Sequence, residues 1–288
     1  MHKLPVLVAL FLLALAEART AAADPKFEID YKAAVEYGTG AGEKLLLDVA
    51  TPKGAEGPRP ALVFIHGGGW AAGNRSAHVA QIKDAAARGY VAVTVSYRFA
   101  PKHVFPAQVE DVKCAVRWLR AHAKELNVNP DRIGAIGVSA GGHLAMMLAL
   151  MNKEDGLEGA GGWADQSSKV QAAVSFVGPT NFTVDFPPTT TQILKTWIGG
   201  TKEEKPEMYK KASPLTYVDG KDAPVLLYQG TTDVLVPFDQ AVQMADALTK
   251  AKVKARVELL VGEGHGWGGK EMERTIRGMF EFLDGQLK

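Results

Sequence analysis

One serine stands between paired glycines in the segment Gly137-Val138-Ser139-Ala140-Gly141. A serine hydroxyl becomes a strong nucleophile only when a base takes its proton. G-x-S-x-G is the pattern in which such a serine lies on a tight turn between a strand and a helix. Glycines suit that turn because a Cβ at either flank would collide with the neighbouring elements. An ordinary glycine-rich turn has the same composition, so other parts of the chain are needed to distinguish it from a turn that holds a nucleophile.

The acid and the base that Ser139 needs follow two later apolar segments. Asp233 lies in GTTDVLVP after Val225–Gln229, and His265 lies in GEGHGWGG after Arg256–Val261. A histidine can take the serine proton, and a carboxylate fixes its tautomer and steadies its positive charge. The chain order serine, aspartate, histidine is that of α/β-hydrolases. We therefore predict a catalytic triad of Ser139, Asp233 and His265.

A glycine run, HGGGW at residues 66–70, follows the apolar segment Ala61–Ile65. Backbone N–H groups without side chains in the way can hold the negative oxygen of a tetrahedral intermediate. We predict that Gly68, Gly69 and Ala140 form this oxyanion hole. A phosphate-binding loop is a poorer interpretation, because neither G-x-x-x-x-G-K-[ST] nor G-x-G-x-x-G is present.

Other side chains have weaker claims on the site. Asp239 could replace Asp233 as the acid, but it begins a helical pattern, where a role at the helix N-terminus is favoured. Trp70, Phe182 and Trp197 are predicted to bind substrate because they lie in loops at the expected site, although single aromatic residues more often serve packing. The predicted chemistry needs no metal and no cofactor.

Strand and helix patterns alternate along the chain, which favours an α/β fold with a mostly parallel sheet flanked by helices. In such a sheet the working residues follow the carboxyl ends of the strands. Two segments, Asn152–Lys169 and Asn181–Val218, are long for connections and are expected to cover the site or the sheet edge. The predicted strands are Phe27–Tyr37, Lys44–Ala50, Ala61–Ile65, 90–98, Ile133–Val138, Val170–Val177, Val225–Gln229 and Arg256–Val261, and the predicted helices include Ser76–Arg88, Gln108–Leu126 and His143–Leu150.

The N-terminus has the layout of a secretory signal: a basic residue, an apolar run over residues 4–16, and small residues ending near Ala23. We expect residues 1–23 to be a signal peptide, residues 24–288 to be one catalytic domain, and the protein to be secreted or periplasmic. A retained N-terminal anchor is the alternative, although the run is short for a membrane span. Without this segment the chain has equal numbers of basic and acidic residues. It has no basic block for nucleic acid, so neither nucleic acid nor, for the mature chain, a membrane is an expected partner.

Several separate blocks resemble α/β-hydrolase serine esterases of the hormone-sensitive-lipase-like branch, and most of all the bifunctional feruloyl/acetyl-xylan esterase-like group. They are HGGGW, SYRFAPKHVFPA, EDVKCAVRWLRAHA, NPDRIGAIGVSAGGHLA, GPTNF, ASPLTYV and GTTDVLVP. The resemblance implies the α/β-hydrolase fold and the same triad and oxyanion residues. The segment before HGGGW is short, so we expect no large N-terminal cap and only a small lid from Asn181–Val218.

The sequence thus predicts a secreted serine carboxylesterase that hydrolyses short- to medium-chain esters through an acyl-enzyme. Its substrate would be a small-molecule or polysaccharide-linked ester, including acetyl or feruloyl esters of plant polysaccharides. An amidase or peptidase on the same fold is the alternative, and a binding protein that has lost its chemistry is a further one. A complete triad argues against the binding protein, because a binder need not keep all three residues.

Overall fold

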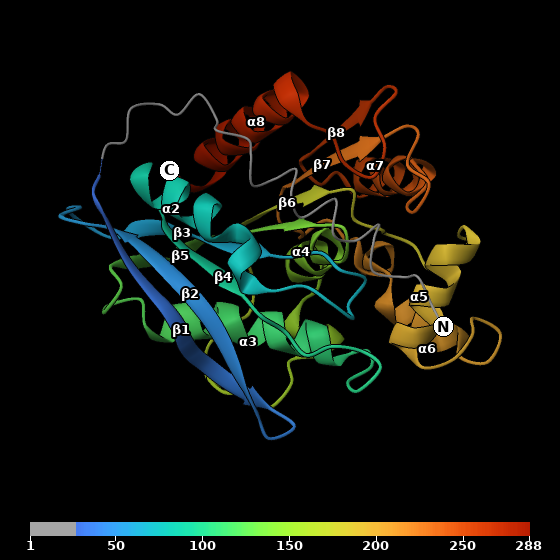
Figure 1. Ribbon diagram of the computed structural model, residues 1–288, viewed down its shortest axis with the longest axis horizontal. Coiled ribbons are helices and arrows are strands. Elements are labelled where there is room, and N and C mark those ends of the chain that lie inside the picture. Colours follow the sequence, from blue (N-terminus) through green and yellow to red (C-terminus); the bar gives the residue numbers. More distant parts are fainter. Residues whose placement is uncertain (1–26) are drawn as a thin grey trace.

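The computed structural model describes residues 27–288, so the predicted signal peptide lies outside the described residues (Figure 1). Eight strands of this part of the chain form one sheet in the order β1-β2-β4-β3-β5-β6-β7-β8. Strands β1 and β2 are antiparallel to their neighbours, and β3 to β8 run parallel. The strands are β1 (Ile29–Gly40), β2 (Glu43–Pro52), β3 (Arg59–Ile65), β4 (Val91–Val95), β5 (Val128–Val138), β6 (Ala172–Phe176), β7 (Val225–Gly230) and β8 (Ala255–Leu260).

Helices connect the parallel strands, as the alternating pattern predicted. The α-helices are α2 (Val79–Ala87), α3 (Ala107–Ala121), α4 (Ala140–Leu150), α5 (Pro188–Ile198), α6 (Pro206–Ala212), α7 (Asp239–Ala251) and α8 (Gly269–Leu287). Short 3₁₀ helices, η1 (Arg75–His78), η2 (Lys153–Asp155) and η3 (Pro214–Tyr217), lie in the connections.

The sheet separates two apolar cores. Helices α3, α4 and α7 contribute to one core, on one face of the sheet. Helices α2 and α8 contribute to the other. Strands β4 and β6 are buried along their whole length, as expected for parallel strands covered on both faces. This is the α/β-hydrolase fold predicted from the sequence, and no large cap is present among the described residues.

The long connection between β6 and β7 contains α5 and α6, which lie together to one side of the sheet (Figure 1). Its position at the carboxyl ends of the parallel strands follows from its start directly after β6. The predicted helix over 108–126 ends earlier, at Ala121, because the backbone leaves helical geometry at His122, with φ −100° and ψ 14°. Asn127, with a left-handed φ of 55°, then leads into β5. The segment Asn181–Val218, which contains α5 and α6, is thus a small helical cover and is named the covering segment.

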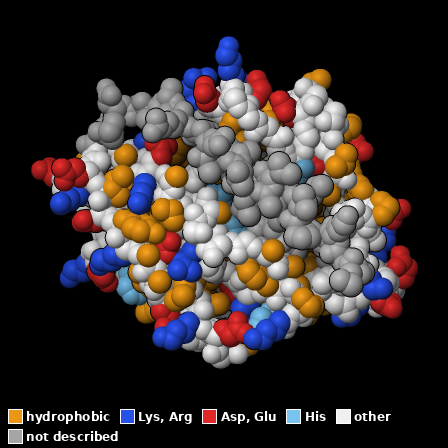
Figure 2. Space-filling model, viewed as in Figure 1, with side chains coloured by type: hydrophobic (Ala, Val, Ile, Leu, Met, Phe, Trp, Pro, Cys, Tyr) orange, Lys and Arg blue, Asp and Glu red, His pale blue; other side chains and the backbone are white. Residues whose placement is uncertain are grey.

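Positive and negative side chains are interspersed on the face in Figure 2, in keeping with the near-neutral composition. Over residues 27–288, no helix combines the length and the apolar character needed to cross a membrane.

Candidate active site

Ser139 lies between β5 and α4 with φ 55° and ψ −120°, a strained conformation for a residue with a side chain. The two flanking glycines are required by close packing. A Cβ on Gly137 would lie 2.1 Å from the carbonyl oxygen of Gly141, and a Cβ on Gly141 would lie 2.0 Å from that of Ile65. The segment therefore folds as a nucleophile elbow, which turns the serine out of the sheet at the end of its central strand.

Loops at the ends of β7 and β8 bring Asp233 and His265 to this serine. The Nε2 atom of His265 lies 2.9 Å from the Oγ atom of Ser139, and its Nδ1 atom lies 2.7 Å from Oδ2 of Asp233. Three residues separated by up to 126 positions form one hydrogen-bonded chain. With Nδ1 protonated, Nε2 can accept the serine proton, which is the arrangement that activates a hydroxyl nucleophile.

The Asp233 carboxylate is fully buried and accepts hydrogen bonds on both oxygens. Its Oδ1 accepts from the backbone N–H groups of Leu235 and Val236, at 2.8 and 2.9 Å. Its Oδ2 accepts from Nε2 of Gln229 at 3.0 Å as well as from His265. These donors fix the orientation of the carboxylate. The rival Asp239 is instead the exposed first residue of α7.

The glycine loop after β3 lies against the elbow. A Cβ on Gly67 would be 2.9 Å from the carbonyl oxygen of Val138 and 3.3 Å from the Cβ of Ser139. Gly68 and Gly69 have φ values of 120° and 58°, in the region that favours glycine. The loop thus brings bare backbone beside the serine, where the predicted oxyanion donors would have to be.

The three aromatic residues predicted to bind substrate lie in the protein interior. Trp70 is 2% exposed, and Phe182 and Trp197 are not exposed at all. The rings of Trp70 and Trp197 stack at 3.8 Å between centroids, and Phe182 packs edge-on to both. The sequence predicted that these rings line a pocket. In the structure they pack on one another between the glycine loop and α5, and this packing removes their apolar area from water. A direct contact with substrate stays a prediction.

Helix α5 covers the glycine loop. The side chain of Ile193 is partly buried and would touch a Cβ on Gly69 at 3.1 Å. The helix is also tied to the loop that carries the acid, since the Thr190 hydroxyl donates to the carbonyl oxygen of Leu235 at 2.7 Å. Ile193 is therefore an apolar group close to the predicted oxyanion hole that the sequence reasoning missed.

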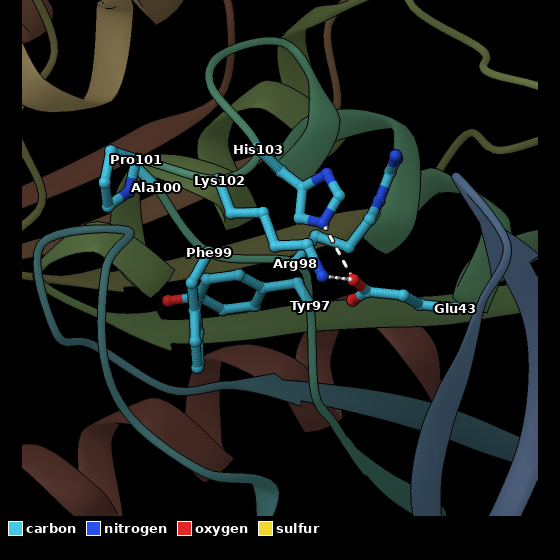
Figure 3. Close-up of a pocket in the computed structure, with 8 residues that line it drawn as sticks. All are labelled: Glu43, Tyr97, Arg98, Phe99, Ala100, Pro101, Lys102 and His103. Atoms are coloured by element: carbon cyan, nitrogen blue, oxygen red, sulfur yellow. Dashed lines mark hydrogen bonds and ion pairs between the residues drawn. The ribbon is translucent and has the colours of Figure 1, made fainter.

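A pocket of about 600 Å³ lies beside this site, in the loop between β4 and α3. It is lined by Glu43 and residues 97–103, and none of the triad residues is among them. In Figure 3, Lys102 and His103 are both directed at Glu43: Lys102 forms an ion pair with it, and Nε2 of His103 lies 3.1 Å from its Oε1. The same loop contacts the glycine loop, because the Tyr97 hydroxyl donates to the carbonyl oxygen of His66 at 2.9 Å. The loop therefore supports the glycine loop while presenting a separate hollow.

The elbow serine, its hydrogen-bonded histidine and aspartate, and the parallel sheet define the class of protein: a serine hydrolase of the α/β-hydrolase fold. Within that class, the sequence matches the BD-FAE family over residues 47–248, and the chain belongs to this family. The family resemblance predicted from the sequence motifs is confirmed.

Relatives and solved structures agree with this assignment. The chain is 32% identical over 197 residues to the probable carboxylic ester hydrolase LipM of Mycobacterium tuberculosis. The aligned region covers 67% of this chain and 45% of LipM. A truncated carbohydrate esterase from gut microbiota has a TM-score of 0.77 at 26% identity, covering 91% of this chain and 98% of that one. The propionate-bound esterase 2 of Thermogutta terrifontis has a TM-score of 0.74 at 28% identity, covering 91% and 94%; the same esterase is also known phosphonylated by sarin. The chain spans about half the length of the curated relatives it matches.

Gln229 is a second residue that the sequence reasoning did not single out. Its Nε2 donates to Asp233 and also, at 2.8 Å, to the carbonyl oxygen of Val236. A glutamine at the end of the otherwise apolar run VLLYQG was the available signal, and in the structure this side chain is buried. Buried polar side chains are hydrogen-bonded, so this residue had to have a partner near the strand end.

Proposed function

We propose that this protein is a serine carboxylic ester hydrolase that acts on short- to medium-chain esters through an acyl-enzyme. The observation that carries the proposal is the position of His265, which bridges the Ser139 hydroxyl and the buried Asp233 carboxylate. The esterase names of the relatives support the choice of an ester over an amide or a peptide.

In the proposed reaction, His265 Nε2 takes the proton of Ser139 while Oγ attacks the ester carbonyl carbon. The backbone N–H groups of Gly68, Gly69 and Ala140 stabilise the oxygen that becomes negative, each contributing about 3 kcal/mol. The tetrahedral intermediate collapses, the C–O bond to the alcohol breaks, and the alcohol leaves with the proton from His265. Water then attacks the acyl-enzyme by the same route and releases the carboxylic acid and the free serine.

Two observations support a small acyl group and a carbohydrate-linked alcohol. Ile193 lies close above Gly69, which limits the space for a long acyl chain beside the oxyanion donors. One similar structure is that of a carbohydrate esterase, and another is an esterase with bound propionate. From the contact at Ile193 we propose acetyl esters of plant polysaccharides as the preferred substrate class. Feruloyl esters, whose acyl group is larger, are the second candidate and rest on the family resemblance of the sequence. Rates on p-nitrophenyl acetate, butyrate and hexanoate, on acetylated xylan and on methyl ferulate test it.

The chemistry is tested with Ser139→Ala. We expect kcat to fall by about 10⁴- to 10⁶-fold with the fold intact, as for loss of a triad nucleophile. An organophosphate should label the wild type once, at Ser139, and should not label the variant. Full activity in the variant, or labelling at another residue, would overturn the proposal.

We also propose that residues 1–23 are removed on export and that the catalytic domain begins at residue 24. The support is the basic, apolar and small-residue order of this segment. The mass of the protein recovered from the medium or periplasm tests the proposal, and an N-terminus at Met1 in a membrane fraction would favour the retained anchor.

A further inference from the structure

His143 is a fully buried histidine that the proposed mechanism does not use. It lies in the first turn of α4, four residues after Ser139, and its backbone N–H donates to the carbonyl oxygen of Ser139 at 3.0 Å. The helix that carries the nucleophile therefore also carries this imidazole. A buried imidazole needs a partner for each ring nitrogen, so its two contacts define its protonation state.

Both nitrogens of His143 have partners on other elements. The indole Nε1–H of Trp70 can only donate, and it lies 3.2 Å from Nδ1 of His143. The backbone carbonyl oxygen of Ala212 can only accept, and it lies 2.8 Å from Nε2. These partners require a neutral ring with the proton on Nε2. Burial favours the same neutral form, since it lowers the pKa of His143 to about 3.

Trp70 needs such a contact because its backbone is strained. It has a φ of 56°, in the left-handed region, directly after two glycines with positive φ. A bulky residue holds that conformation only where its surroundings over-determine it. The stack on Trp197, the edge-on contact with Phe182 and the hydrogen bond to His143 fix the Trp70 side chain, and the last of these is its polar contact.

We propose that His143 is a positioning residue for the glycine loop. As a neutral imidazole protonated on Nε2, His143 holds Trp70 against the helix that follows the nucleophile and, through Ala212, against the covering segment. This inference rests on the proposed function, because the proposed reaction is what makes Gly68 and Gly69 oxyanion donors. By setting Trp70, His143 sets the distance between the loop N–H groups and the elbow serine. Its effect should therefore fall on the transition state.

The test compares two replacements of the same ring. His143→Phe keeps the aromatic packing and removes both hydrogen bonds, whereas His143→Gln keeps one acceptor and one donor. We expect the phenylalanine variant to lose about 10- to 100-fold in kcat on p-nitrophenyl acetate with KM changed less than about twofold, because displaced oxyanion donors weaken the transition state. The glutamine variant should recover most of that loss.

Two further variants separate positioning from general stability. Trp70→Phe removes the indole N–H together with part of the ring that stacks on Trp197, so it has a packing cost of its own. In combination with His143→Phe the loss in kcat should be smaller than the product of the two single losses, because both changes break the same hydrogen bond. His122→Phe is the matched control. His122 also stacks on a tryptophan, Trp118, at 4.5 Å and bonds to its carbonyl oxygen, but at the end of α3. We expect its kcat to stay within about twofold of the wild type.

The ¹⁵N NMR spectrum of histidine-labelled wild type provides a readout that needs no activity. The signal that disappears in His143→Gln should show Nε2 protonated and Nδ1 accepting a hydrogen bond at pH 7. A charged ring or the Nδ1–H tautomer would overturn the proposal even in an active enzyme. A folded His143→Phe variant with wild-type kcat would also overturn it. An inactive wild type with the expected tautomer would instead count against the proposed function.

Discussion

The substitution Asp233→Asn tests the triad at the residue with the most contacts. An asparagine has one oxygen and one NH₂ group where the aspartate has two acceptors. If the NH₂ group faced the backbone N–H groups of Leu235 and Val236, two buried donors would lose their acceptor. The less costly orientation turns NH₂ toward His265. Gln229 cannot reverse its amide to compensate, because its Nε2 also donates to Val236.

His265 must then accept at Nδ1 and carry its proton on Nε2, where it cannot take the proton of Ser139. The wrong tautomer costs about 10⁴-fold in kcat, or about 5 kcal/mol of transition-state free energy. The assay is kcat on p-nitrophenyl acetate at pH 7, with circular dichroism and a urea midpoint to show that the variant is folded. The elbow serine remains in place, but labelling by an organophosphate should slow to a similar extent.

The matched control is Asp239→Asn. Asp239 is exposed at the start of α7, and its replacement should change kcat by less than about twofold. If Asp233→Asn kept kcat within tenfold of the wild type, or if Asp239→Asn caused the larger loss, the assignment of the acid would be wrong.

The remaining predictions concern specificity and pH. Ile193→Ala should raise kcat/KM for hexanoyl relative to acetyl esters by about tenfold, because it opens space above Gly69; an unchanged ratio would show that Ile193 does not face the acyl chain. Burial lowers the pKa of His66 to about 4 and those of His78 and His143 to about 3. In the unfolded chain these histidines have the ordinary pKa of 6.5, so below that pH the unfolded chain binds protons that the folded chain does not. The free energy of unfolding in urea should therefore fall as the pH falls, by about 2 kcal/mol for each histidine between pH 7 and pH 5, and a flat profile would contradict this.

The sequence predicted most of the sheet because its parallel strands are buried on both faces and read as short apolar runs. Each site motif could be found at a strand end for the same reason. The motif around Ser139 was informative because its glycines are required by backbone contacts at about 2 Å, which no other residue could satisfy. Local sequence was therefore enough to predict the elbow and the glycine loop.

The aromatic residues show what the sequence could not decide. Trp70, Phe182 and Trp197 lie in segments that reach the site, and their type fits a pocket wall as well as an interior cluster. Only the approach of α5 to the glycine loop distinguishes the two, and that approach depends on contacts between residues more than a hundred positions apart. The same applies to His143, whose partners lie 73 and 69 positions away on different sides.

The covering segment is joined to the catalytic elements by several contacts, of which three come from well-separated positions along it. Thr190 bonds to the loop of the acid, Trp197 stacks on the residue after the glycines, and the carbonyl of Ala212 accepts from the nucleophile helix. A segment held this way cannot change the shape of the acyl site without moving the groups that perform the chemistry. Apolar side chains such as Ile193, which lie against the glycine loop but take part in none of these three contacts, are therefore the positions at which substrate preference can vary while the rate of acyl transfer is kept.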